Sequence, residues 1–204
     1  MSETKERIRL VAEKLFFENG IANARLQQVA DEAGISVGNL AYHYKNKEAI
    51  VEAVYEHLFE EFEQILASYL QLPDLRDFDQ QFELLYQFFT RNTFYLNNVW
   101  EIERSYPHLK ESWHKFNQKI TLQIRKRLDY NQKRDILLPE VYKGTYDQLA
   151  QAIWITLNHW IPQQMLQGKR WSFAGYRKAL WNQVLPYLTE KGKKEYEVLI
   201  LAVR

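Results

Sequence analysis

One short stretch of the sequence gathers side chains that suit contact with nucleic acid, namely Val37, Gly38, Asn39, Tyr42 and His43. They combine small groups, an amide, a phenol and an imidazole. An amide can bond the edge of an adenine in the major groove, whereas hydroxyl and ring groups can reach phosphate oxygens. A small domain has no packing need for such a cluster on one exposed face. The stretch therefore predicts a surface that reads bases or holds phosphates.

A turn between two short helices is expected to position this surface. The first helix is indicated by apolar residues at the spacing of one helix face: Leu26, Val29, Ala30 and Ala33. Gly34 follows the last of them, where a helix end commonly needs the left-handed backbone that glycine adopts without strain. The pattern predicts a helix that stops at a sharp turn, as between crossed helices.

The second helix is expected to begin after Ser36, whose hydroxyl can accept a hydrogen bond from a backbone N–H two or three residues later. Leu40 and Tyr44 lie four residues apart and supply its buried side. In a helix-turn-helix, the N-terminal residues of the second helix face base edges. This arrangement leaves the polar and aromatic stretch described above on the outside.

Two flanking helices are expected to complete the N-terminal head. Residues 3–19 carry an apolar face, with Ile8, Val11, Ala12, Leu15 and Phe16, and a polar side that we expect to be solvated, with Lys5, Arg7, Arg9 and Lys14. Asn46 can cap a further helix that runs from Lys47 to Tyr69 and ends at Leu72-Pro73-Asp74. Because this helix begins in the head and ends in the body, no flexible linker is expected between them.

The ordered set of these features resembles the N-terminal domain of the tetracycline-repressor (TetR) family of bacterial transcription regulators. The resemblance covers roughly residues 5–58 and rests on Val29-Ala30, Ala33-Gly34-Ile35-Ser36, Leu40 and the run Tyr42-His43-Tyr44-Lys45-Asn46-Lys47. It implies an operator of double-stranded DNA as the partner. The DNA-binding residues that we expect are Arg25, Ser36, Val37, Gly38, Asn39, Tyr42, His43 and Lys47.

The sequence departs from the family pattern at two places. Ala41 stands where the family usually has a tyrosine that touches a phosphate, and that contact can pass to Tyr42. Ala24-Arg25 stands where the family usually has a threonine. Arg25 then either replaces the threonine contact with a charged one or is simply solvated.

Composition narrows the class of protein without identifying it. The 204 residues carry a net charge of +1, with no cysteine, so a disulfide framework and thiolate chemistry are excluded. The five histidines, His43, His57, His108, His114 and His159, show no metal-ligand spacing, and no glycine-rich phosphate loop is present. With neither a signal region nor an apolar run of membrane-spanning length, the sequence indicates a cytoplasmic protein that is not an enzyme and that needs no cofactor, metal or membrane.

The remaining sequence predicts an all-α fold with two domains. Residues 1–47 form the helix-turn-helix DNA-binding domain, and residues 48–204 form a larger helical domain for effector binding and dimerisation. Apolar residues at helical spacing predict helices over 77–96, 107–133, 146–167, 173–189 and 195–203. Pro162 is expected to kink the third of these near Asn158, whose carbonyl loses its hydrogen-bond partner. The aromatic residues along these helices can form a ligand cavity, or they can simply form a core.

The resemblance supplies candidate residues for the two functions of the larger domain. A pocket for an apolar or aromatic effector is expected from the middle helices, lined by Tyr86, Phe89, Trp113, Phe116, Asn117, Trp154 and Asn158. A homodimer interface is expected from the last two long helices, with Trp160, Trp171, Phe173, Tyr176 and Trp181. The same aromatic residues can instead close the core of a single chain.

These features together favour a ligand-responsive transcription regulator, and more specifically a repressor that an apolar or aromatic small molecule releases from its operator. The alternative is a DNA-binding regulator whose larger domain recognises a protein partner and no small molecule.

Overall fold

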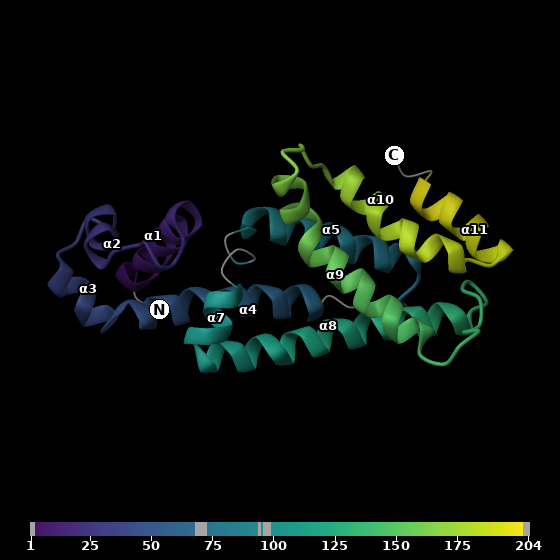
Figure 1. Cartoon of the computed structure of the whole chain (residues 1–204), viewed down its shortest axis with the longest axis horizontal. Helices are drawn as coiled ribbons and strands as arrows, with labels where there is room; N and C mark the ends of the chain where they lie inside the picture. Colours follow the sequence, from purple (N-terminus) through teal and green to yellow (C-terminus); the bar gives the residue numbers. More distant parts are fainter. Residues whose placement is uncertain (1–2, 68–72, 94, 96–98, 202–204) are drawn as a thin grey trace. The chain divides into compact units, whose positions relative to one another are not determined.

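The computed structural model describes residues 3–67, 73–93, 95 and 99–201, and it is built from helices (Figure 1). The first half contains α1 (Glu3–Asn19), α2 (Leu26–Glu32), α3 (Val37–His43), α4 (Lys47–Ala67), α5 (Leu75–Arg91) and α7 (Val99–Ser105). The second half contains α8 (Pro107–Lys133), α9 (Thr145–Leu166), α10 (Phe173–Val184), the 3₁₀ turn η1 (Leu185–Tyr187), α11 (Glu190–Tyr196) and the π-helical turn η2 (Glu197–Leu201). The all-α prediction is confirmed.

Most predicted helices are present, with some shifted ends. The helix predicted to reach residue 96 ends at Arg91, and the one predicted over 173–189 changes to a 3₁₀ turn after Val184 because Pro186 cannot continue the α-helical pattern. Helix α9 continues through Pro162 to Leu166. The predicted ends of α4 at residues 68–72 and of the last helix at residues 202–203 lie outside the described residues.

The chain divides into two compact units. Unit 1 comprises residues 1–63 and 92–114, and unit 2 comprises residues 64–91 and 115–204. Helices α4 and α8 each contribute residues to both units. The domain boundary predicted after Lys47 divides the DNA-binding function from the effector-binding and dimerisation functions. It does not coincide with the division into compact units, and it stays a prediction. No helix in the described part of the chain has the length and apolar character needed to cross a membrane.

Unit 1 contains the N-terminal head, in which α1 packs on α2 and α2 packs on α3. Its core is apolar and includes Ile8, Ala12, Leu15, Phe16, Val29, Ala30 and Leu40. The prediction that Arg9 is solvated is wrong, because this residue is only 2% exposed. Its guanidinium instead bonds Glu6 at 2.6 Å and Glu13 at 2.9 Å, one turn away on either side.

In unit 2, helices α5, α9 and α10 pack against one another (Figure 1). Large buried rings fill the space between these helices. Phe78, Phe82 and Trp181 meet edge to face or tilted, with centroids 4.8 to 6.1 Å apart. Such aromatic geometry adds to the stabilisation that comes from area burial alone.

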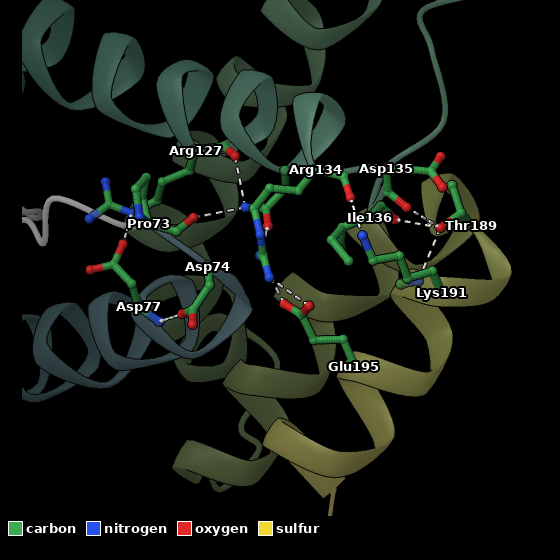
Figure 2. A network of polar contacts seen from close by, with 12 residues as sticks. Pro73, Asp74, Asp77, Arg127, Arg134, Asp135, Ile136, Thr189, Lys191 and Glu195 are labelled. Carbon is green, nitrogen blue, oxygen red and sulfur yellow. Dashed lines mark hydrogen bonds and ion pairs between the residues drawn. The ribbon is translucent and has the colours of Figure 1, made fainter.

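A polar network ties the end of α8 to the start of α5 and to α11 (Figure 2). Arg127 Nε donates to Asp77 Oδ2 at 2.7 Å, and each of these side chains is 2% exposed. Directly after α8, Arg134 forms two hydrogen bonds with Glu195, at 3.0 and 2.8 Å. Lys191 and Thr189 then bond backbone carbonyls of residues 134–136. The network sets the register of these helices within unit 2.

We expect Asp77→Ala to destabilise the protein by about 3–5 kcal/mol, because it leaves the buried Arg127 guanidinium without this carboxylate. The urea unfolding midpoint measures the change. As controls, Lys14→Met at the exposed Lys14–Glu32 pair should leave the midpoint nearly unchanged. The double change Asp77→Leu with Arg127→Met should recover most of the loss. A small effect of Asp77→Ala alone would contradict this role of the network.

Candidate nucleic-acid interface and ligand cavities

The turn between α2 and α3 has the predicted geometry. Gly34 adopts a φ of +66°, and its N–H donates to the Asp31 carbonyl while that of Ile35 donates to the Ala30 carbonyl. Ser36 then caps α3, since its hydroxyl oxygen accepts a hydrogen bond from the backbone N–H of Asn39 at 3.1 Å. Short caps of this kind stabilise a helix that is too short to form alone.

Burial on α3 separates a packing side from a free side. Leu40 is fully buried and Tyr44 is 4% exposed, with its hydroxyl donating to the Lys5 carbonyl at 3.3 Å. The opposite side presents the predicted group. Val37, Gly38 and Asn39 are exposed, Tyr42 is 84% exposed, and His43 is half-buried against the Tyr42 ring, with centroids 5.1 Å apart. The structure therefore brings these five residues together on one exposed face.

Arg25 and Lys47 take up positions beside this face. Arg25 precedes α2 with an exposed side chain, and its backbone N–H donates to Gln28 Oε1 at 3.0 Å. Lys47, at the first position of α4, donates from Nζ to the Ala22 carbonyl at 3.0 Å. This bond ties the start of α4 to the segment before α2, so Lys47 has a positioning role within the head that the sequence did not indicate.

A capped second helix, turned outward behind a glycine turn, defines a helix-turn-helix DNA-binding protein. Two family descriptions match the chain: "Bacterial regulatory proteins, tetR family" over residues 8–54, and "Bacterial transcriptional repressor" (TetR) over residues 43–196. The protein belongs to the TetR family of bacterial transcription regulators.

Individual relatives agree with this assignment over part of their length. The chain is 40% identical over 57 residues to the HTH-type transcriptional regulator YerO of Bacillus subtilis, a match that covers 28% of this chain and 20% of YerO. It is 34% identical over 58 residues to TtgR of Pseudomonas putida, covering 28% of each. The matched parts are thus under a third of these relatives' lengths.

A solved structure extends the likeness of the fold to the whole chain. The crystal structure of a TetR-family regulator from Marinobacter aquaeolei VT8 superposes with a TM-score of 0.85 over 100% of both chains, at 19% sequence identity. This likeness shows the arrangement of helices. The prediction of the family and of a head followed by a larger helical region is confirmed.

Five of the seven predicted ligand-binding residues meet in unit 2, with Trp154 at their centre. Its indole N–H donates to Asn117 Oδ1 at 2.6 Å, and its ring lies 5.5 Å from Phe116 and 6.3 Å from Phe89 between centroids. Asn158, one turn farther along α9, donates to the Trp154 carbonyl at 3.1 Å. Phe89, Phe116, Trp154 and Asn158 are buried, and Asn117 is half-buried at the edge of the cluster.

The other two predicted ligand-binding residues lie elsewhere. Tyr86 packs on Phe173 and Tyr176, with centroids 5.3 and 5.2 Å away. Trp113 belongs to unit 1, where its ring contacts Tyr95 at 4.9 Å and Phe59 at 6.3 Å. The predicted residues therefore do not form one lining, and their role in ligand binding stays a prediction.

Unit 1 contains an apolar cavity that the sequence did not indicate, lined by Tyr55, Phe59, Tyr95, Val99, Ile102 and Trp113. A weak signal was present, because Tyr55 and Phe59 lie one turn apart on the helix that begins at Lys47. Burial raises the pKa of both the Tyr55 and Tyr95 hydroxyls well above their usual values, and Glu101 adds to the effect at Tyr55. Both phenols therefore stay neutral.

The predicted dimer residues differ in burial within the single chain. Tyr176 and Trp181 are 0% and 1% exposed, and the Trp181 indole donates to Asp79 Oδ1 at 2.7 Å. Trp160 and Phe173 are half-buried, while Trp171 is 38% exposed. The two buried rings thus belong to the core of unit 2, so the dimer prediction depends on the more exposed residues.

Proposed function

We propose that this TetR-family regulator is a homodimeric repressor that binds an operator through α3 and is released by a small molecule. The observation that carries the proposal is the free side of α3, where Tyr42 is 84% exposed and Asn39 is exposed beside it. A large aromatic side chain exposed to solvent on a capped helix does not contribute to the core of the head. Contact with DNA would account for its exposed position.

The side chains on this face suit distinct contacts. The Asn39 amide can make a bidentate pair with adenine, which is the most discriminating contact open to it. Tyr42 takes over the phosphate contact that Ala41 lacks, since its hydroxyl extends beyond the helix surface. Arg25 adds a charged phosphate contact. The remaining members, Ser36, Val37, Gly38, His43 and Lys47, shape and support the surface.

The dimer in this proposal uses an exposed stripe on α9. Ile155 is 59% exposed and Leu166 is 84% exposed, and their spacing of eleven residues places them on one side of the helix. Met165, 44% exposed, and Trp171 extend the apolar surface beyond it. An isologous pairing of this face with a second copy would cover it.

Asn39→Ala should flatten base preference at one or two positions of the operator, at a cost of about 1–3 kcal/mol if the contact is bidentate. Lys47→Ala should instead weaken binding to all sequences alike. Affinities across a library of single-base operator variants separate the two patterns. Equal loss on every sequence for Asn39→Ala would remove this residue from base reading. Leu122→Ala, at an exposed position in unit 2, serves as the control.

The alternative function keeps the DNA-reading head but assigns unit 2 to a protein partner. The exposed segment around Val141 and Tyr142, 84% and 77% exposed, favours it as a second candidate. Operator release by a purified small molecule distinguishes the two, because a protein-controlled regulator would not respond.

A further inference from the structure

Helix α3 carries no lysine, arginine, aspartate or glutamate between Val37 and His43. In the major groove, guanine presents two acceptors that arginine or lysine usually binds, and the amino group of cytosine suits a carboxylate. His43 lies in the last turn, half-buried against the Tyr42 ring, whereas the N-terminal residues of such a helix face the base edges. The side chains of α3 are therefore poorly suited to read a G·C pair.

The basic side chains of the head lie on other segments. Arg25 precedes α2, and Lys45 and Lys47 follow α3. The Lys47 ammonium donates to the Ala22 carbonyl at 3.0 Å. Arg25 and Lys45 are exposed at the edges of the reading surface, where a contact with phosphate carries no base information. These cations do not supply the donors to guanine that α3 lacks.

The outer side of α3 instead presents two apolar groups and one amide. Val37 is 37% exposed and Ala41 is exposed, and their spacing of four residues places them on the same flank of the helix. Thymine is the base that carries a methyl group in the major groove, and small apolar side chains contact it there. Asn39, on the other flank, suits adenine. All three side chains therefore match the two bases of an A·T pair.

Gly38 lies between these two flanks and leaves the helix surface flat. A Cβ atom added to it would meet only the Ser36 hydroxyl oxygen, at 3.9 Å, and its φ is not in the left-handed region. Neither packing within the head nor the backbone conformation requires glycine, although glycine destabilises a helix relative to alanine. Close approach to a groove does require it, because short side chains touch a methyl group only at about 3.5–4 Å.

We propose that α3 selects half-sites with A·T pairs beneath it, through contacts of Val37 and Ala41 with thymine methyl groups and of Asn39 with adenine. This selection rests on the proposed function, because it names the class of DNA sequence that the repressor would recognise. Ala41 is then a base-reading residue, and the short side chain at this position leaves room for the thymine methyl.

The first test removes single methyl groups from the DNA. The full-length protein is used to select duplexes from a random library, and each thymine of the most enriched duplex is replaced in turn by deoxyuridine, which lacks only the C5-methyl group. Fluorescence anisotropy at constant ionic strength should show a loss of affinity of about fourfold for each contacted methyl. Thymines outside the half-sites serve as the control and should show no loss.

The second test assigns one methyl group to one side chain. Val37→Ala should reduce the loss caused by deoxyuridine at a single position of each half-site and leave it unchanged at the others. Val141→Ala is the matched control, because Val141 is 84% exposed in unit 2 and should leave every loss unchanged. An equal loss at every position in Val37→Ala and in the wild type would overturn the contact of Val37 with a methyl group.

Gly38→Ala tests the close approach of α3 with two readouts. The substitution should not lower the melting temperature, because the added methyl group meets no close neighbour in the head. Operator affinity should fall by about 10-fold, because the methyl group holds Val37 and Ala41 away from their thymines. Unchanged affinity would show that α3 does not approach the bases closely and would overturn the proposed contacts.

The outcome of the selection separates this proposal from the proposed function. Enrichment of half-sites with G·C pairs beneath α3 overturns the A·T selection and leaves a sequence-specific repressor intact. Enrichment of A·T half-sites that tolerate deoxyuridine everywhere assigns the preference to DNA shape and overturns the methyl contacts. Enrichment of no sequence contradicts the proposed function itself.

Discussion

Ile155→Glu combined with Leu166→Glu is expected to yield monomers that no longer hold the operator. In an isologous interface each substitution appears twice, so four like charges come together on a surface that is now apolar, which costs several kcal/mol. Each monomer then binds one half-site through its single α3, and the contribution of the second half-site to affinity is lost. Operator affinity should fall by at least 100-fold, although the head remains folded.

Sedimentation at micromolar concentration and operator binding by fluorescence anisotropy measure the two effects together. Leu122→Glu provides the matched control, because Leu122 is 54% exposed on α8 and is not one of the residues of the α9 stripe. A double variant that stays dimeric would move the interface elsewhere. The buried Tyr176 and Trp181 are unsuitable targets, because a charge there would unfold unit 2 itself.

A small molecule that releases the protein should also bind less well when operator is present. Thermodynamic linkage requires the operator to lower the affinity for the small molecule by the same factor as the small molecule lowers the affinity for the operator. A coupling free energy of about 1–3 kcal/mol corresponds to a factor of roughly five to 150. The structural route is α4, which runs without interruption from Lys47 to Ala67. In the proposed dimer, movement of this helix would alter the separation of the two reading helices, and half-sites about 34–36 Å apart tolerate little error.

Compounds that quench tryptophan fluorescence are the starting set, because Trp113 and Trp154 lie in the aromatic clusters of the two units. Each hit is titrated with operator, with a scrambled duplex of equal length, and without DNA. Affinity that is the same under all three conditions would leave the compound without a regulatory role. A complete absence of hits would favour the protein-partner alternative.

The head was predictable because its signals are local. The cap at Ser36, the positive φ at Gly34 and the burial of Leu40 and Tyr44 each follow from residues within a few positions of one another. Arg9 was misjudged, although Glu6 and Glu13 stand at the spacing that lets a helix bury an arginine between two carboxylates.

The body was less predictable because its contacts join distant segments. Helical spacing correctly places Phe116 and Trp154 on buried faces, yet it cannot say that Trp113, three residues before Phe116, packs into the other unit. The cavity in unit 1 depends on Tyr95 approaching Tyr55 from forty residues away. Periodicity identifies which side of a helix is covered but not what covers it.

We propose that α3 of a dimer reads a specific DNA sequence. The most direct test of this proposal is selection of the purified wild-type protein on random duplex DNA, followed by the mass of the resulting complex. The account predicts enrichment of an inverted repeat with half-sites one helical turn or a multiple apart, bound by an even number of chains, and loss of that enrichment in Asn39→Ala. Recovery of unrelated sequences, or of a single half-site bound by one chain, would contradict it.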